Sequence, residues 1–166
     1  MTLGPRMTPG AFRRLTLGEV DLARAVFGDS LSFGRIWLFA LPIWNRAFVP
    51  GGGLIVWPAA SALQDFSAAP LGAQGVFIHE LTHVWQAQQG VNLILAKLKA
   101  GDSDQTYAYD LNERCEFSDL NIEQQAMVVQ HAFLSARGAQ APFETHVYSA
   151  TLANWPGSIF SNPHQV

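Results

Sequence analysis

The amino-acid sequence predicts an α+β fold, in which a small mixed or antiparallel sheet packs on a buried helix that a second helix faces. Two short runs rich in aromatic and β-branched residues, Ile36–Phe39 and Leu54–Trp57, predict strands in the first part of the chain. Two longer apolar segments, over residues 71–89 and 121–138, have the length of helices. A chain of 166 residues can bury one core, so we expect a single domain over residues 15–157.

The composition excludes several classes of protein. Hydrophobic residues make up 49% of the chain and charged residues 14%. No apolar run reaches the roughly 18 to 20 residues that span a bilayer, so we expect no membrane span. The net charge is −3 and the basic residues form no patch, which argues against nucleic acid as a partner.

Residues 1–14 are expected to form a loose N-terminal leader. The segment contains Arg6, Arg13 and Arg14 but no apolar stretch or small-residue cleavage site, so it is not a secretory signal. The one cysteine, Cys115, excludes an intramolecular disulfide and fits a reducing compartment. The sequence therefore predicts a cytoplasmic protein, and export by a contractile secretion machine stays open.

The expected domain begins with a short helix and a strand. Thr16 and Glu19 have the spacing of a capping box and predict the start of a helix that Gly28 ends. Residues 32–41 carry the first aromatic-rich run and predict a strand. Gly51–Gly53 predict a hairpin turn before the second strand, with a flexible rim to a cleft as the alternative.

The longest predicted helix is a buried one. Pro70 is well placed to begin this helix and Gly90 to end it. Apolar side chains cover nearly its whole circumference, which is typical of a helix inside a core. These side chains are Leu71, Val76, Phe77, Ile78, Leu81, Val84 and Trp85.

This helix carries the motif H-E-x-x-H, formed by His79, Glu80 and His83. Four residues of helix turn through about 400°, so both imidazoles lie on one face, one turn apart, where they suit a single Zn²⁺. Glu80 can then approach a metal-bound water without being a ligand. The alternative is a helix that happens to carry two histidines. It is disfavoured because charged groups in a buried helix need partners.

Glu123 is the acidic residue that we favour as the third ligand. It lies at the start of the second long helix, whose N-terminus Asn121 or Asp119 can cap, and a rigid helix presents a ligand at little entropic cost. The alternative role for Glu123 is a favourable contact with the helix dipole. The other candidate ligands are Glu116 and Glu113.

The remaining segments predict minor elements. Residues 91–100 have the pattern of an amphipathic helix, and residues 101–104 that of a polar loop. Residues 142–153 predict a last helix. The tail over residues 158–166 is expected to be frayed.

The motifs together resemble those of a known class of enzymes. A helical H-E-x-x-H followed some forty residues later by a helix-borne glutamate looks like the gluzincin branch of zinc metallopeptidases, which includes thermolysin. More closely, four segments resemble small bacterial Vgr-related proteins, which are associated with type VI secretion or related injection systems. The matching segments are Leu15–Glu19, Val26–Gly28, His79–Gln86 and Asn121–Ala126, within a stretch from Leu15 to Gly138.

The resemblance implies a zincin-like fold and a zinc-dependent hydrolase that cleaves peptide bonds. By that match His79, His83 and Glu123 would bind one Zn²⁺ and Glu80 would be the general base. The partners would be a peptide or protein substrate and possible secretion-system proteins. In zincins a strand beside the metal helix often adds an extended peptide to its edge, a role that Leu54–Trp57 would take here.

The sequence departs from the thermolysin pattern at one position. That pattern has an aspartate one turn after the ligand glutamate, and it braces a zinc-bound histidine. Here the position is Met127. Another group, with Asp110, Asp119 and a backbone carbonyl as candidates, would have to orient the imidazole.

Two questions stay open at this point. The second donor to the scissile carbonyl is one of five polar side chains that the sequence does not rank: Tyr107, Tyr109, His131, His146 and Tyr148. The function is that of a small metallopeptidase or, alternatively, of a non-catalytic zinc-binding accessory or structural component of a secretion machine. Glu80 favours the first, because a purely structural zinc site needs no base.

Overall fold

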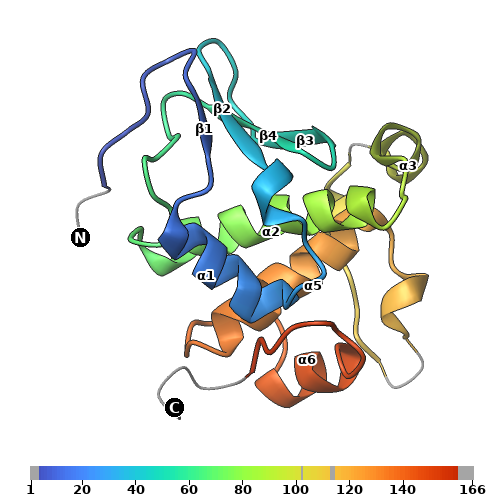
Figure 1. Ribbon diagram of the computed structural model, residues 1–166. Helices are drawn as coiled ribbons and strands as arrows, with labels where there is room; N and C mark the ends of the chain where they lie inside the picture. The colour runs from blue at the N-terminus through green and yellow to red at the C-terminus, as the bar shows by residue number, and fades with distance from the viewer. Residues whose placement is uncertain (1–3, 102, 113–114, 161–166) are drawn as a thin grey trace.

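The computed structural model describes residues 4–101, 103–112 and 115–160, and Figure 1 shows their arrangement. A four-stranded sheet lies on one side of the long helix α2, and α5 packs on α2 as well. The elements in chain order are β1 (Phe12–Arg14), α1 (Leu17–Phe27), η1 (Phe33–Arg35), β2 (Trp37–Leu41), β3 (Phe48–Gly51), β4 (Leu54–Pro58), α2 (Leu71–Gln88), α3 (Leu93–Ala100), α4 (Asp104–Tyr107), η2 (Phe117–Asp119), α5 (Ile122–Ser135) and α6 (Thr145–Thr151).

The sheet is mixed and has the strand order β1-β2-β4-β3. The central pair, β2 and β4, is parallel, with Trp37 opposite Leu54 and Phe39 opposite Val56. The two outer pairs are antiparallel. The predicted α+β class with a small mixed sheet is therefore confirmed, and so is the hairpin turn at the glycine triplet, which joins β3 to β4.

The prediction that Leu54–Trp57 adds a peptide strand is wrong. These residues belong to β4, which pairs with β2 on one side and β3 on the other, so its backbone hydrogen bonds are already used. The edge strand beside α2 is β3. Its sequence gave a weak strand signal, because it is four residues long and contains Pro50.

The N-terminal segment is not loose where the structure describes it, from residue 4 onward. Met7 is buried in the core and β1 pairs with β2. The Arg13 guanidinium donates to both carboxylate oxygens of Glu19, at 2.7 and 2.6 Å. Glu19 is fully buried. The loose leader expected over residues 1–14 is thus not seen from residue 4 onward, because Arg13 has a buried partner that its position in the sequence does not reveal.

Helix α1 begins as the sequence predicts, and the tail packs against the end of this helix. Thr16 and Glu19 form the predicted capping box, and Gly28 ends the helix with φ +57°. The tail is less frayed than expected at its start, because the Ser158 amide donates to the Ala25 carbonyl and Ile159 is buried. The rest of the tail, residues 161–166, lies outside the described residues.

The ends of the two long helices agree with the sequence. Pro70 is the N-cap of α2, and Gly90 follows its C-cap in the left-handed region, at φ +94°. The Asn121 side chain caps α5 by accepting from the amides of Glu123 and Gln124. The two N-caps, Pro70 and Asn121, fix where the helices begin. They therefore determine which side chains of α2 and α5 face each other.

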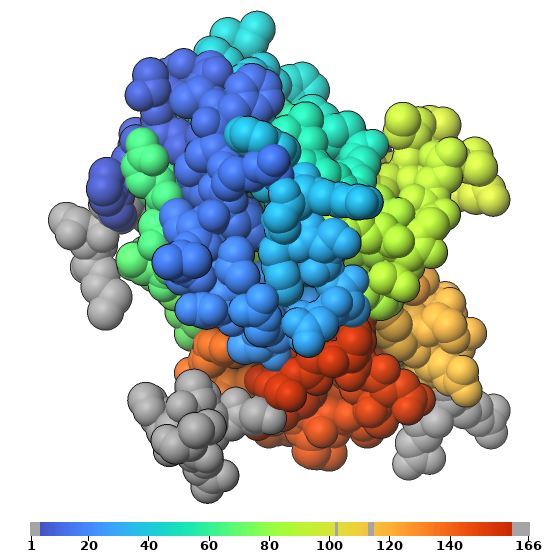
Figure 2. All heavy atoms as spheres, viewed as in Figure 1, coloured from blue at the N-terminus to red at the C-terminus, as the bar shows by residue number. Residues whose placement is uncertain are grey.

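Helix α3 differs from the amphipathic helix expected over residues 91–100. Its one buried residue is Leu93, whereas Ile94 and Leu98 are 66% and 76% exposed. Figure 2 shows the yellow-green atoms of this region standing out at one side of the molecule. Among the described residues, no helix combines the length and hydropathy that crossing a bilayer requires.

Candidate metal centre

The site lies between α2 and α5, which cross closely. Gly75 makes this approach possible, since a Cβ at that position would lie 3.0 Å from Leu134 of α5. The three motif residues of α2, His79, Glu80 and His83, are all buried. As expected from the helical spacing, both imidazoles lie on the face that α5 covers.

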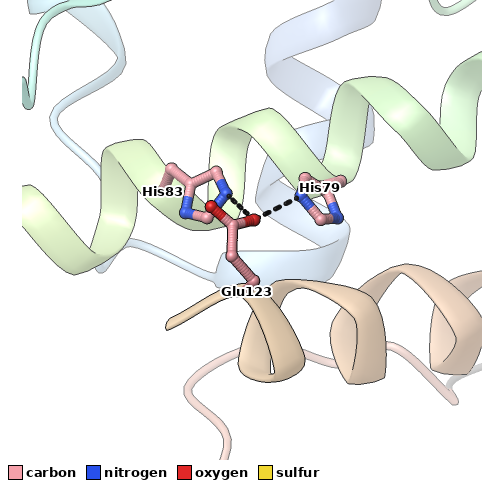
Figure 3. Close-up of side chains that lie close together, drawn as sticks. All are labelled: His79, His83 and Glu123. Atoms are coloured by element: carbon pink, nitrogen blue, oxygen red, sulfur yellow. Dashed lines mark hydrogen bonds and ion pairs between the residues drawn. The ribbon is translucent and has the colours of Figure 1, made fainter. Parts of the chain in front are cut away.

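Glu123 lies in the first turn of α5 and points between the two histidines (Figure 3). Its Oε2 lies 3.4 Å from His79 Nε2 and 3.0 Å from His83 Nε2. One ligand atom from each of the three residues lies within 4.8 Å of the others. The side chain favoured as third ligand from the sequence is thus the one that the fold brings to the motif.

Of the two competing carboxylates, the one that the structure describes, Glu116, is not at this site. Glu116 is exposed at the N-cap of η2, in a groove with Trp85 and Trp155. Glu113 lies outside the described residues.

Gln86 fixes the protonation of His83. The amide nitrogen of Gln86 donates to the Ile122 carbonyl at 3.0 Å and to Gln125 Oε1 at 2.9 Å, so its oxygen must be the atom that faces His83 Nδ1, at 2.8 Å. His83 Nδ1 therefore carries the proton, and the lone pair of Nε2 is directed at Glu123. This is the tautomer that a metal requires.

Gln86 thereby orients the His83 imidazole, a role for which the sequence offered Asp110, Asp119 or a backbone carbonyl as candidates. Asp119 instead accepts from the Glu116 amide at the protein surface, and Asp110 is exposed. The sequence analysis missed Gln86, although a signal was present. It lies three residues after His83, on the same face of the helix.

The donor set fits a divalent metal ion. With Nδ1 of His83 protonated, Nε2 and the Glu123 carboxylate face each other as two acceptors, which only a proton or a cation between them can satisfy. Burial acts to raise the pKa of Glu123, but its contacts with His79 and His83 and the charge of Lys97 hold that pKa well below its usual range, so the carboxylate is ionised. Two imidazoles and one carboxylate are the ligands of many catalytic zinc sites.

One carboxylate oxygen of Glu80, Oε2, is buried without a hydrogen-bond partner among the described residues. The side chain lines a cleft beside the histidines. Burial raises the pKa of Glu80, against the opposing charges of His79 and Lys97. An unpaired buried carboxyl group with a raised pKa is typical of a functional site rather than of a structural one.

The cleft above these residues has a volume of about 750 Å³. Its apolar walls come from the segment that leads into β3, from α2, from α3 and from α5. They include Trp44, Phe48, Val76, Ile94, Leu98 and Met127. An open, mostly apolar cleft with a few convergent polar groups is the usual form of a small-molecule or peptide site.

Of the five candidate donors, Tyr107 is the one that lines the cleft, where its hydroxyl accepts from Arg46 at 2.9 Å. Tyr109 instead bonds to His131 Nδ1 and to the Tyr148 hydroxyl, in a cluster among α5, α6 and the segment before η2. His146 is exposed on α6. None of these four residues lines the cleft.

No protein-family model matches the chain. The chain is 34% identical over 165 residues to the type VI secretion system spike protein VgrG2b of Pseudomonas aeruginosa strain PAO1, and the match covers 92% of the chain but 16% of that much longer protein. It is also similar to the solved structure of the effector domain of VgrG2b, with a TM-score of 0.70 and 34% identity, over 92% of the chain and 87% of that domain.

Proposed function

Because the chain belongs to the family of the VgrG2b effector domain, we propose that it is an effector domain of this kind and acts as a zinc-dependent peptidase. One observation carries the proposal. Glu80 Oε2, which has no hydrogen-bond partner among the described residues, belongs to a side chain that lines an open cleft, beside a buried set of two imidazoles and a carboxylate.

Each residue of the site would have its own role in hydrolysis of the peptide bond. His79, His83 and Glu123 would hold the zinc ion, which when bound supplies a Lewis acid and lowers the pKa of water at its open position. Glu80 Oε2 can accept a proton from the attacking water and return it to the leaving nitrogen. The Gln86 amide keeps His83 in the ligating tautomer throughout.

The form of the cleft supports a peptide as substrate. Phe48 of the edge strand β3 lines the cleft, so an extended peptide lying there would run beside the free backbone edge of that strand. The exposed apolar side chains of Trp44, Ile94 and Leu98 would contact bulky apolar residues of such a peptide.

The likeness to VgrG2b supports a proposal about how this chain leaves the cell that makes it. The relative that the chain matches is a spike protein of a type VI secretion system, and we infer that this chain is also exported by such a system and contacts its components. A second function is a non-catalytic one, in which zinc joins α2 to α5 within a secretion particle. The position of the cluster, whose three residues come from two helices far apart in the sequence, is the observation that favours that alternative.

Glu80→Gln separates the two functions. We expect this variant to bind as much zinc as the wild type and to lose cleavage of a peptide library by a factor of at least about 10², the lower end for loss of a general base. Zinc content is measured in parallel with cleavage. If the wild type binds zinc but cleaves no peptide that the Glu80→Gln variant leaves uncut, the non-catalytic function is the one that remains.

A further inference from the structure

The two oxygens of the Glu123 carboxylate have different partners. Oε2 faces the histidines, at 3.4 Å from His79 Nε2 and 3.0 Å from His83 Nε2. Oε1 lies 3.3 Å from the ammonium group of Lys97. Only Oε2 is therefore directed at the position that a metal ion would take.

Lys97 reaches this carboxylate from α3, so a third helix contributes to a site whose other residues lie on α2 and α5. Helix α3 begins at the Asn92 cap and is anchored by the buried Leu93. The Lys97 side chain is 37% exposed, whereas that of Glu123 is 5% exposed. The ion pair is thus shielded at its carboxylate end and open to the cleft at its ammonium end.

We propose that Lys97 is a positioning residue that holds Oε1 of Glu123 away from the metal, so that Glu123 binds the ion through Oε2 alone. This inference rests on the metal centre of the proposed function. A carboxylate that binds through both oxygens fills two coordination positions, whereas one bound through a single oxygen leaves a position for water. Lys97 thereby keeps the site in the open form that hydrolysis needs.

Lys99 provides a matched control on the same helix. Lys99 lies two positions after Lys97 on the helix, with one residue between them, so the two side chains point to different sides. Lys99 is exposed, and the sequence contains no lysine other than Lys97 and Lys99. Lys99→Met therefore removes the same charge from the same helix without touching Glu123.

Substitution of Co²⁺ for zinc tests the proposal by absorption spectroscopy, because four-coordinate Co²⁺ absorbs visible light several-fold more strongly than five-coordinate Co²⁺. We expect an intense band for the wild type, Lys99→Met and Lys97→Arg, and a several-fold weaker band for Lys97→Met. Co²⁺ should bind Lys97→Met no more weakly than the wild type, because the substitution removes a repelling cation and frees a second oxygen. A residue that merely supports the fold would instead weaken Co²⁺ binding when replaced.

Equal band intensity in the wild type and Lys97→Met would overturn the proposal, and so would a weak band in the wild type. Circular dichroism checks the fold of each variant. Were Lys97→Met to unfold, Lys97→Gln would take its place with the same expected loss of intensity. Failure of the proposed function gives a different result. A wild type that shows an intense Co²⁺ band but cleaves no peptide would contradict the peptidase activity and leave the role of Lys97 intact.

Discussion

At the scale of single residues, the site combines groups that the sequence identifies with groups that it does not. The helical spacing of His79 and His83 was enough to predict that both lie on one face of the helix, and the position of Glu123 near a helix start was enough to favour it as the side chain that meets them. Gln86 was missed, because glutamine is common on helices and only the contact with His83 Nδ1 distinguishes it. Sequence patterns identify ligands more readily than the neutral side chains that orient them.

The role of Gln86 leads to a first prediction. Gln86→Leu should lower zinc affinity by about 10- to 100-fold, since loss of a partner that orients a ligand typically has this effect. A competing chromogenic chelator measures the affinity. Gln88→Leu is the control on the same helix, because Gln88 bonds to Ser32 and Gly52 and not to a ligand. Equal affinities for both variants would show that His83 needs no such partner.

The buried carboxyl group of Glu80 leads to a second prediction, for the metal-free protein. Burial raises the pKa of Glu80 above its usual value of 4.5, so the folded state holds this proton more tightly than the unfolded chain. The resulting stability is fully present below that usual value and is lost as the pH rises through the raised pKa of the folded state. Glu80→Gln should therefore be more stable than the wild type at pH 7, by about 1 kcal/mol or more.

Chemical denaturation in the presence of a chelator measures this difference at pH 4 and pH 7. The gain from Glu80→Gln should shrink at the lower pH, where the wild-type carboxyl group is protonated. A gain that is the same at both pH values would mean that the charge of Glu80 costs the folded state nothing.

At the scale of elements, the contact between α2 and α5 decides whether the ligands meet. The sequence predicted both helices and their caps correctly, because Pro70, Gly90 and Asn121 are strong end signals. It did not show how closely the helices approach, which depends on a glycine of α2 packed against a leucine of α5. It predicted a helix at α3 but did not show that only Leu93 of this helix is buried, while Ile94 and Leu98 are exposed.

Gly75→Val tests this contact. The new side chain would collide with Leu134, which a Cβ alone would already approach to 3.0 Å. We expect a loss of stability of about 1–3 kcal/mol and weaker zinc binding, because α5 must move away with Glu123. Gly72→Ala is the control on the same helix, since nothing lies within 4 Å of its Cβ position.

The double variant Gly75→Val/Leu134→Ala should recover part of both losses, because it relieves the same collision. Thermal denaturation and chelator competition measure the two effects. Zinc affinity that stays at the wild-type value in Gly75→Val would mean that the spacing of α2 and α5 does not control the site.

At the scale of the whole molecule, the resemblance to Vgr-related proteins was confirmed by the likeness to the VgrG2b effector domain. The α+β class was also predictable, because strands and helices carry distinct patterns. The strand order was not, since the parallel pairing of β2 with β4 and the position of β3 at the edge depend on long-range contacts. The packed N-terminal segment depends on Arg13 and the buried Glu19, whose pairing has no local signature in the sequence.

The candidate metal centre brings together two parts of the chain that are far apart, with His83 on α2 and Glu123 on α5. Zinc that binds to the folded state alone would stabilise that state, by about 4 kcal/mol at a thousandfold excess of free zinc over the dissociation constant. For a chain of this length, that gain corresponds to a rise in Tm of about 8–16 °C. We expect such a rise for the wild type and for Glu80→Gln, measured by thermal denaturation with zinc and with a chelator.

Glu123→Ala should remove most of this rise, because α5 then offers the ion no ligand. Glu116→Ala is the matched control, since Glu116 is a glutamate near α5 that lies away from the histidines. It should keep the full rise. A rise as large in Glu123→Ala as in the wild type would mean that zinc binds α2 without joining it to α5, and the centre described here would lose its third ligand.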